Sequence, residues 1–261
     1  MTLREDANTN HAFRCSCVLF AAAVALLPPG LTAQSPDDPP IVSSGLHATI
    51  LRREGRPSIY YAISIPPNYT PTVAVPLVLA LHYGVGGSTG SGAGRDLVRI
   101  VVGPAFADLG AIIVAPDSLG GDWSTPENED AVDDLLEAIV ARYAVDTKKI
   151  AVTGYSMGGA GTWHIAEKFR RRFSAAIPVS GRPPASAPGW TLPVFAVHSR
   201  NDQVMPFGPT EARVTELQKA GVNAKLVALT GITHFEMNRF VPALRQAVPW
   251  LREVWLRESP K

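Results

Sequence analysis

The stretch that decides the fold reads, from residue 145 to residue 159, Val145-Asp146-Thr147-Lys148-Lys149-Ile150-Ala151-Val152-Thr153-Gly154-Tyr155-Ser156-Met157-Gly158-Gly159. An apolar run over 150–153 leads into a Gly-x-Ser-x-Gly turn centred on Ser156, and a helical pattern over 157–169 follows directly. A turn of this kind between a strand and a helix strains the serine and exposes it at the helix N-terminus, while the glycines let the turn pack closely. The stretch therefore predicts a buried strand that ends in a nucleophile, Ser156.

Short apolar runs alternate with helical patterns on both sides of this motif. Two early segments, 46–51 and 59–65, alternate apolar and polar residues, as an antiparallel pair with one solvated face does. The continuous apolar runs that follow are typical of parallel strands covered on both faces, and they span 76–81, 111–115, 150–153, 175–179, 194–197 and 224–229. Helical patterns lie near 95–108, 129–143, 157–169, 209–220 and 240–257. The order predicts an α/β domain with an eight-stranded, mostly parallel sheet flanked by helices.

A second Gly-x-Ser-x-Gly match surrounds Ser88, over residues 86–90. It lies inside a glycine-rich loop that leads into no immediate helix, so the strand–turn–helix context is missing. We therefore predict that Ser156, and not Ser88, is the nucleophile.

A serine nucleophile needs a base, and the base needs an acid that orients it. In folds with a strand–turn–helix serine of this kind, called a nucleophile elbow, the three residues follow along the chain in the order serine, acid, histidine. The only aspartate after Ser156 is Asp202, which stands just beyond the apolar run that ends at 197; the alternative is that it caps a turn. Of the three later histidines, His234 on the loop before the last helix is the predicted base. We expect His164 on a helix surface and His198 as a hydrogen-bonded core residue.

Developing negative charge on a substrate needs two backbone N–H donors. The residue after the nucleophile, Met157, is predicted to supply one, and the loop over 81–87 the other, from either Tyr83 or Gly84. His82 is expected to hold the shape of this loop.

Residues 1–33 have the pattern of a secretory signal peptide, with an uncleaved amphipathic tail as the alternative. A basic start precedes an apolar run over 18–27 that is too short to cross a bilayer as a helix, and Ala33 supplies a small residue at the predicted cut. Residues 34–44, rich in Pro, Asp and Ser, predict a linker, and 45–261 the catalytic domain. We expect a secreted or periplasmic protein without a stable membrane anchor.

Composition narrows the class of protein further. The chain has 261 residues, of which 46% are hydrophobic and 18% charged, and its formal net charge of +1 gives no strong field to draw nucleic acid. Both cysteines, Cys15 and Cys17, lie in the predicted signal peptide, so the mature chain would hold neither a disulfide nor a thiolate zinc site. No metal and no cofactor are expected.

Together these stretches resemble the compact esterases of the α/β-hydrolase superfamily, near the phospholipase/carboxylesterase, feruloyl-esterase and polyhydroxyalkanoate-depolymerase-like branches. The likeness spans 59–256 and rests on residues 81–87, 145–159, 201–206 and 233–235. These branches generally carry His-Gly where this chain has His82 and Tyr83. The resemblance implies the α/β-hydrolase fold, with Trp123 and Asp117 lining the substrate cleft.

The resemblance also implies hydrolysis of small or polymeric carboxylic esters, with short acyl, aromatic or polyester-derived groups, through Ser156, His234 and Asp202. Only the dozen residues 180–191 separate two predicted strands where many relatives insert a cap, so no large cap is expected. A serine peptidase of the same fold and a non-catalytic binding protein are the alternatives.

Overall fold

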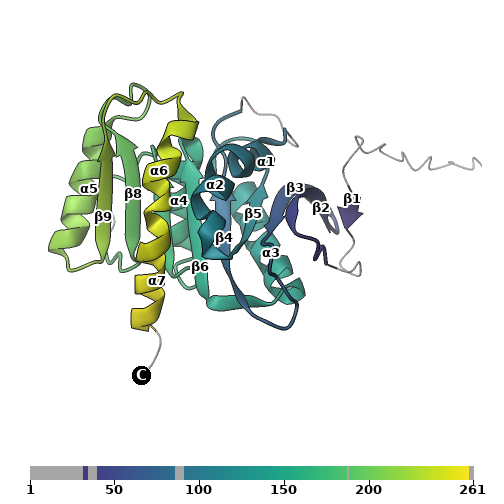
Figure 1. Ribbon diagram of the computed structural model, residues 1–261. Coiled ribbons are helices and arrows are strands. Elements are labelled where there is room, and N and C mark those ends of the chain that lie inside the picture. The colour runs from purple at the N-terminus through teal and green to yellow at the C-terminus, as the bar shows by residue number, and fades with distance from the viewer. Residues whose placement is uncertain (1–31, 35–39, 86–90, 187, 259–261) are drawn as a thin grey trace, which may run out of the picture.

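The computed structural model of the chain describes residues 32–34, 40–85, 91–186 and 188–258 (Figure 1). Residues 1–31 of the predicted signal peptide, part of the predicted linker and the Ser88 motif at 86–90 lie outside the described residues.

Nine strands form one sheet within the described residues, in the order β1-β2-β3-β5-β4-β6-β7-β8-β9. Their bounds are β1 Thr32–Gln34, β2 Gly45–Arg53, β3 Arg56–Ile65, β4 Val75–Leu81, β5 Ile112–Pro116, β6 Val145–Tyr155, β7 Ala175–Val179, β8 Val194–Ser199 and β9 Ala224–Leu229. The pairs β2–β3 and β3–β5 are antiparallel, and the other neighbours are parallel. Strands β2 to β9 are the eight expected ones in the order of the α/β-hydrolase fold, so the predicted fold class is confirmed. The short β1, parallel to β2, is an addition that the sequence pattern did not predict.

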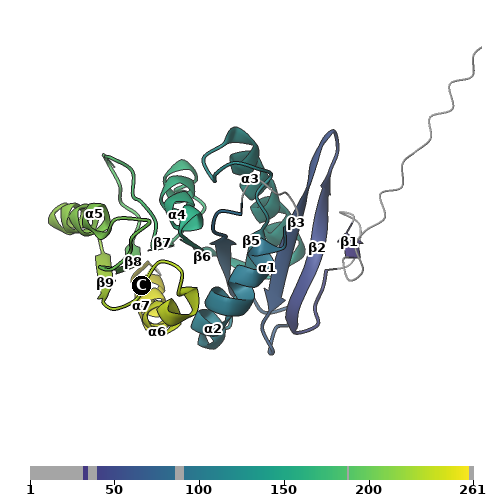
Figure 2. The same cartoon turned by 90° about the horizontal axis from the view of Figure 1, so that it is seen from above.

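The helices cover the sheet on both faces (Figure 2). One face carries α3 (Pro126–Arg142), α4 (Met157–Lys168) and α5 (Phe207–Lys219). The other carries α1 (Ala93–Leu97), α2 (Gly103–Phe106), α6 (Val241–Arg245) and α7 (Ala247–Glu258). A π-helical turn, Val98–Val102, joins α1 to α2, and two short 3₁₀ turns lie at Ala107–Leu109 and Met237–Phe240.

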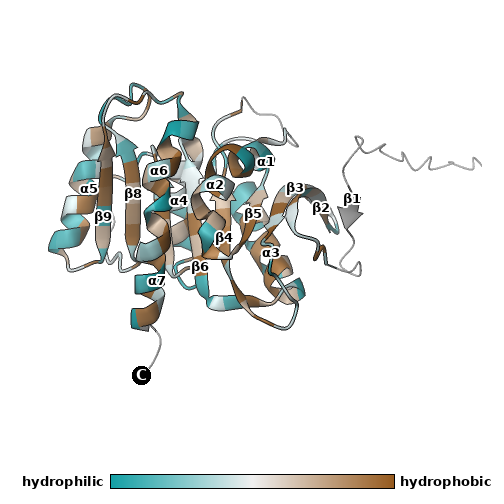
Figure 3. Ribbon diagram, in the orientation of Figure 1, coloured by the Kyte–Doolittle hydropathy of each residue, from teal (hydrophilic) through white to brown (hydrophobic). Residues whose placement is uncertain are grey.

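Each face of the sheet has its own hydrophobic core, which explains why the central strands are apolar at every position. In β4, Leu77 and Leu79 belong to the core under α3, α4 and α5, while Val78 and Ala80 belong to the core under the opposite helices. All four side chains are fully buried, because successive side chains point to opposite faces of a strand. Figure 3 shows the result, with hydrophobic residues along the central strands and hydrophilic ones on the outer turns of α5.

Local chemistry sets the helix boundaries and corrects two predicted ones. Helix α3 begins three residues before the predicted 129, because the Thr125 hydroxyl accepts from the Asn128 amide at 3.4 Å and Pro126 suits the first helical position. The last helix, predicted as one element over 240–257, is instead divided at Gln246. Pro249 lacks an N–H and would clash with the carbonyl four residues back, so α7 restarts at Ala247 and holds Pro249 in its first turn.

The carboxyl ends of the parallel strands meet at one edge of the sheet, at the top of Figure 1. The loops that follow β4, β5, β6, β7, β8 and β9 therefore gather there, and they carry the predicted site residues, apart from Met157 at the start of α4. Between β7 and β8, the described residues of 180–193 form neither helix nor strand. Among the described helices, none has the length and apolar character needed to cross a membrane.

Candidate active site

Ser156 lies between β6 and α4 in a backbone conformation that residues other than glycine rarely adopt. Its φ is 59° and its ψ −115°, one of two positive φ values among the described non-glycine residues. The neighbouring glycines are required by close packing, because a Cβ on Gly158 would lie 1.9 Å from the Leu81 carbonyl oxygen and one on Gly159 would lie 2.3 Å from that of Val179. The Ser156 amide also donates to the Val179 carbonyl at 3.0 Å. The turn is therefore held between the ends of β4 and β7.

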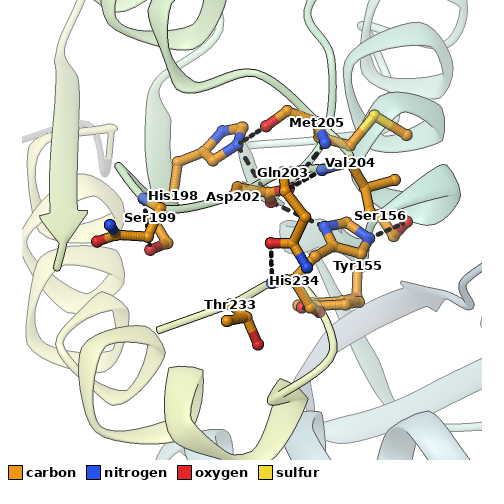
Figure 4. Close-up of polar contacts among 12 residues, drawn as sticks. Tyr155, Ser156, His198, Ser199, Asp202, Gln203, Val204, Met205, Thr233 and His234 are labelled. Carbon is orange, nitrogen blue, oxygen red and sulfur yellow. Dashed lines mark hydrogen bonds and ion pairs between the residues drawn. The ribbon is translucent and has the colours of Figure 1, made fainter. Parts of the chain in front are cut away.

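The side chains of Ser156, His234 and Asp202 form a continuous hydrogen-bonded chain (Figure 4). Nε2 of His234 lies 2.8 Å from Oγ of Ser156, and Nδ1 lies 2.8 Å from Oδ2 of Asp202. All three residues are nearly buried, with exposed fractions of 9%, 5% and 8% for Ser156, His234 and Asp202. In this geometry the imidazole can take the serine proton while the carboxylate orients the ring. The sequence thus predicted three side chains that the structure brings together from three separate loops.

Asp202 is held as a carboxylate by its surroundings. Burial alone would raise its pKa, but hydrogen bonds from His234 and from the amides of Met205, at 2.7 Å, and Val204, at 2.9 Å, outweigh burial and keep the pKa below its ordinary value. The two amides bind Oδ1, which leaves Oδ2 for His234. Asp202 is therefore ionised and aimed at the imidazole across the neutral pH range.

The loop that carries His234 is tied to its neighbours by hydrogen bonds to its backbone. The Tyr155 hydroxyl donates to the His234 carbonyl, and the Ser199 hydroxyl donates to the Ile232 carbonyl at 2.5 Å. The Asn201 side chain accepts from the Gly231 amide at 2.7 Å. Glu236 closes the loop on itself, and the hydrogen bonds of its carboxylate, from the Thr233 amide first, lower its pKa to about 2. The position of His234 is thus fixed by Tyr155, which precedes Ser156, and by Ser199 and Asn201, which precede Asp202.

His198 stands behind Asp202 and is fully buried. Its Nε2 lies 2.8 Å from the Met205 carbonyl, which can only accept, so Nδ1 accepts from the Thr210 hydroxyl at 2.9 Å. Burial is the largest influence on its pKa and lowers it, so the ring is neutral at pH 7. The prediction of a hydrogen-bonded core histidine is confirmed. His164, half-exposed on α4 and 2.6 Å from Glu129, is on the helix surface as predicted.

The predicted oxyanion donors lie on two adjacent segments. Met157 is the first residue of α4, and the first amides of a helix have no acceptor within it. The loop after β4 lies beside it, since a Cβ on Gly84 would be 3.9 Å from Sδ of Met157. The choice between the Tyr83 and Gly84 amides stays a prediction.

His82 holds this loop in place, as predicted. It is fully buried, its Nδ1 lies 2.5 Å from the Tyr83 carbonyl, and its Nε2 accepts from the Ser118 amide at 3.0 Å. The ring thereby joins the loop after β4 to the loop after β5.

The structure corrects the prediction that Asp117 lines the substrate cleft. Its carboxylate accepts from the amides of Gly92, at 2.7 Å, and Gly94, at 2.9 Å, at the start of α1. It borders a small separate cavity with Thr49 and Tyr60. The place of Asp117 in the loop after β5 suggested a carboxylate that faces the ligand. Instead, it binds two amides at the start of α1, on the opposite face of the sheet from α4.

Trp123 borders the pocket beside Ser156, as predicted, but its ring is packed into the loop. Its ring is 1% exposed, its Nε1 donates to the His82 carbonyl at 2.9 Å, and it packs edge-on against the His82 ring at 5.0 Å. It borders the pocket beside the elbow but offers no free ring face to a substrate.

That pocket, which we call the α4 groove, has a volume of about 550 Å³. It is lined by residues 122–124, 182–184 and 204–205 and by the α4 residues Met157, Ala160, Gly161, Trp163, His164 and Glu167. Its lining includes Met157, the residue after Ser156, so the groove lies next to the serine. The groove was not predicted from the sequence, where its one signal is the run of small residues at 158–161.

The chain is similar in sequence to proteins named feruloyl esterases. The chain is 28% identical over 173 residues to the probable feruloyl esterase C of Aspergillus niger, covering 64% of this chain and 61% of that protein. It is 29% identical over 152 residues to feruloyl esterase C of Emericella nidulans, covering 56% of each. The chain therefore spans about 60% of the length of the curated relatives it matches.

Solved structures share the fold. The crystal structure of a thermostable esterase superposes with a TM-score of 0.66 at 22% identity, covering 80% of this chain and 62% of that chain. Esterase 2 of Thermogutta terrifontis superposes with a TM-score of 0.62 at 18% identity, covering 85% and 97%. Residues 104–241, more than half of the chain, match the Dienelactone hydrolase family. The chain belongs to the dienelactone hydrolase family.

Proposed function

We propose that this chain is a serine esterase that hydrolyses carboxylic esters, with Ser156 as nucleophile, His234 as general base and Asp202 as its orienting acid. The observation that carries the proposal is the hydrogen-bonded chain from Ser156 through His234 to Asp202, with 2.8 Å at each link, on a strained strand-to-helix turn. An esterase needs this arrangement, because an unassisted serine hydroxyl is a weak nucleophile.

The proposed reaction has two halves. Oγ of Ser156 attacks the ester carbonyl as its proton passes to Nε2 of His234, and the oxyanion accepts hydrogen bonds from the Met157 amide and from Tyr83 or Gly84. The alcohol then leaves with the proton from His234, and the acyl group stays on Ser156. Water, deprotonated by His234, attacks the acyl-enzyme, and the acid leaves as Oγ takes back its proton.

The proposed substrates are esters with short acyl, aromatic or polyester-derived groups. Two observations support this range: relatives are named feruloyl esterases, and the described residues between β7 and β8 contain no helix that could shield a long acyl chain. We also propose export to the cell exterior or periplasm, on the pattern of residues 1–33.

The test measures hydrolysis of p-nitrophenyl acetate and methyl ferulate by purified protein. Ser156→Ala and His234→Ala should each lower kcat by about 10³-fold or more, and the double variant should be little worse, because the residues act as a unit. Ser88→Ala, in the other Gly-x-Ser-x-Gly match, is the control and should stay within about 3-fold of the parent. Dependence on Ser88 instead of Ser156 would end the proposal.

A fluorophosphonate probe separates the alternatives. Covalent labelling that disappears in Ser156→Ala, together with ester hydrolysis, supports the esterase. Labelling with cleavage of a peptide amide and no ester hydrolysis would identify a peptidase, and no labelling at all a binding protein.

A further inference from the structure

His198 is a buried titratable residue that the proposed reaction does not use. It is the penultimate residue of β8, and by the alternation of a strand its side chain lies on the same face as those of Val194 and Ala196, toward α5. Its exposed fraction is 0%. A buried imidazole needs a partner for each ring nitrogen, so the identity of the two partners shows what the ring can do.

The carboxylate of Asp202 lies between two imidazoles (Figure 4). Its Oδ2 is 2.8 Å from Nδ1 of His234 and 3.5 Å from Nε2 of His198. The side chains of His198 and Asp202 are 1% and 0% exposed, so water screens this contact little. His234 continues the hydrogen-bonded chain to Ser156, whereas the contacts of His198 are with the acid and its loop.

The N–H of His198 is directed at the loop that holds the acid. Nε2 donates to the Met205 carbonyl at 2.8 Å, and the Met205 amide in turn donates to Oδ1 of Asp202 at 2.7 Å. The positive end of the same N–H dipole lies 3.5 Å from Oδ2, an attraction that favours the ionised carboxylate. One imidazole therefore holds Asp202 in two ways, through the backbone of Met205 and directly.

The opposite edge of the ring is anchored to α5. Nδ1 accepts from the Thr210 hydroxyl at 2.9 Å, and the Phe207 ring packs edge-on at a centroid distance of 5.8 Å. Because Nδ1 is an acceptor, the single N–H proton of the neutral ring is on Nε2. The ring is thus a fixed link between α5 and the acid.

We propose that His198 is a positioning residue for ester hydrolysis, which holds the Asp202 carboxylate on His234 while that imidazole carries the serine proton. The inference rests on the proposed function, which makes His234 the base. His198 stays neutral and exchanges no proton in either half of the reaction. Its effect is on kcat, because the imidazolium that Asp202 stabilises forms during the reaction and not on substrate binding.

Two amide substitutions separate the two nitrogens of the ring. The side-chain amide of glutamine reaches the position of Nε2, and that of asparagine reaches only the position of Nδ1. His198→Gln should keep kcat for p-nitrophenyl acetate within about 3-fold of the parent, whereas His198→Asn should lower it about 10-fold or more, since a misplacement of about 1 Å can cost about 10²-fold. KM should change little in both variants, because His198 does not border the α4 groove.

Ser174→Ala is the control for lost stability alone. Its buried hydroxyl donates to the Ile150 carbonyl at 3.0 Å, just before β7 and at the opposite edge of the sheet from the site. The control should melt earlier and keep kcat. Equal kcat in His198→Gln and His198→Asn would overturn the proposal, because a core histidine with no positioning role does not distinguish the two amides.

Proton NMR of the resting protein adds a readout that needs no turnover. The Nδ1 proton of His234, hydrogen-bonded to Asp202, should give a far-downfield resonance in the parent, in His198→Gln and in Ser174→Ala. In His198→Asn the resonance should move upfield or disappear. A resonance that stays in place in His198→Asn would overturn the proposal.

The nitrogen chemical shifts of the parent decide the question if His198→Asn does not fold. They should show His198 protonated on Nε2, and protonation on Nδ1 would overturn the proposal, since Nε2 could then not donate to Met205. A parent that hydrolyses no ester would end the proposed function instead, and the His234 resonance and the His198 tautomer would still decide whether His198 positions Asp202.

Discussion

The hydroxyl of Tyr155 is expected to set the position of the catalytic base, and its removal in Tyr155→Phe tests this. Tyr155 immediately precedes Ser156, is 2% exposed, and donates to the backbone carbonyl of His234. The two rings also lie close together, with centroids 5.5 Å apart. Phenylalanine keeps the ring contact and removes only the hydrogen bond.

The expected magnitudes follow from leaving a buried carbonyl without its donor. That loss costs about 1–3 kcal/mol of the free energy of unfolding. For a domain of this size each kcal/mol lowers Tm by roughly 2–4 °C, so the variant should melt about 2–12 °C lower. The imidazole then has more freedom relative to Oγ of Ser156, and kcat should fall about 10-fold, within the 10²-fold that a 1 Å misplacement costs. KM should change little, because Tyr155 does not border the α4 groove.

The assay pairs thermal unfolding with kcat and KM for p-nitrophenyl acetate. Tyr69→Phe is the matched control: its buried hydroxyl accepts from the Ala144 amide at 3.0 Å, at the opposite edge of the sheet. The control should lose stability and keep kcat. If Tyr155→Phe also melts earlier but turns over at the parent rate, the hydroxyl does not position the base and the reasoning is wrong.

Three further predictions concern acid stability, the elbow and chain length. Burial lowers the pKa of His198, so the folded state resists protonation of this ring. The free energy of unfolding should be steady above about pH 7 and should fall as the pH drops below the unfolded-state pKa near 6.5, by at most about 1.4 kcal/mol per pH unit for this group. In denaturant titrations, His198→Gln should flatten that slope. Gly158→Ala should cost more than about 3 kcal/mol, because its Cβ would meet backbone at 1.9 Å, whereas Gly208→Ala on α5 meets nothing within 4 Å and should be neutral or slightly stabilising in the same measurement. Along a C2-to-C16 acyl series kcat/KM should peak at short chains, since an open site buries few methylenes at about 0.8 kcal/mol each; an optimum at C12 or longer would show that a cover exists.

The strands and the three reacting side chains could be predicted from the sequence because each rests on local chemistry. Buried strands such as 175–179 are apolar at every position, and the Ser156 turn needs its glycines. Asp202 was the only aspartate left after the nucleophile, and His234 followed the last strand. Chain order therefore selected one candidate for each role.

The pocket could not be predicted, because it depends on side-chain direction between segments far apart in sequence. Asp117 and Trp123 follow a strand at the correct edge, yet one binds helix-terminal amides and the other is buried under the loop. The lining of the α4 groove comes from residues 122–124, 182–184 and 204–205 and from α4, segments that no sequence periodicity relates.

The conformation of Ser156 has a consequence for protein engineering. A φ of 59° with a ψ of −115° suits glycine, and holding serine there costs on the order of 1–3 kcal/mol that the remaining contacts must offset. Heat resistance and turnover therefore oppose one another at this position, and Ser156→Gly is expected to raise Tm while ending catalysis. A library selected for heat resistance alone would enrich that inert variant, so any search for a hardier form of the protein has to select for ester turnover in the same round.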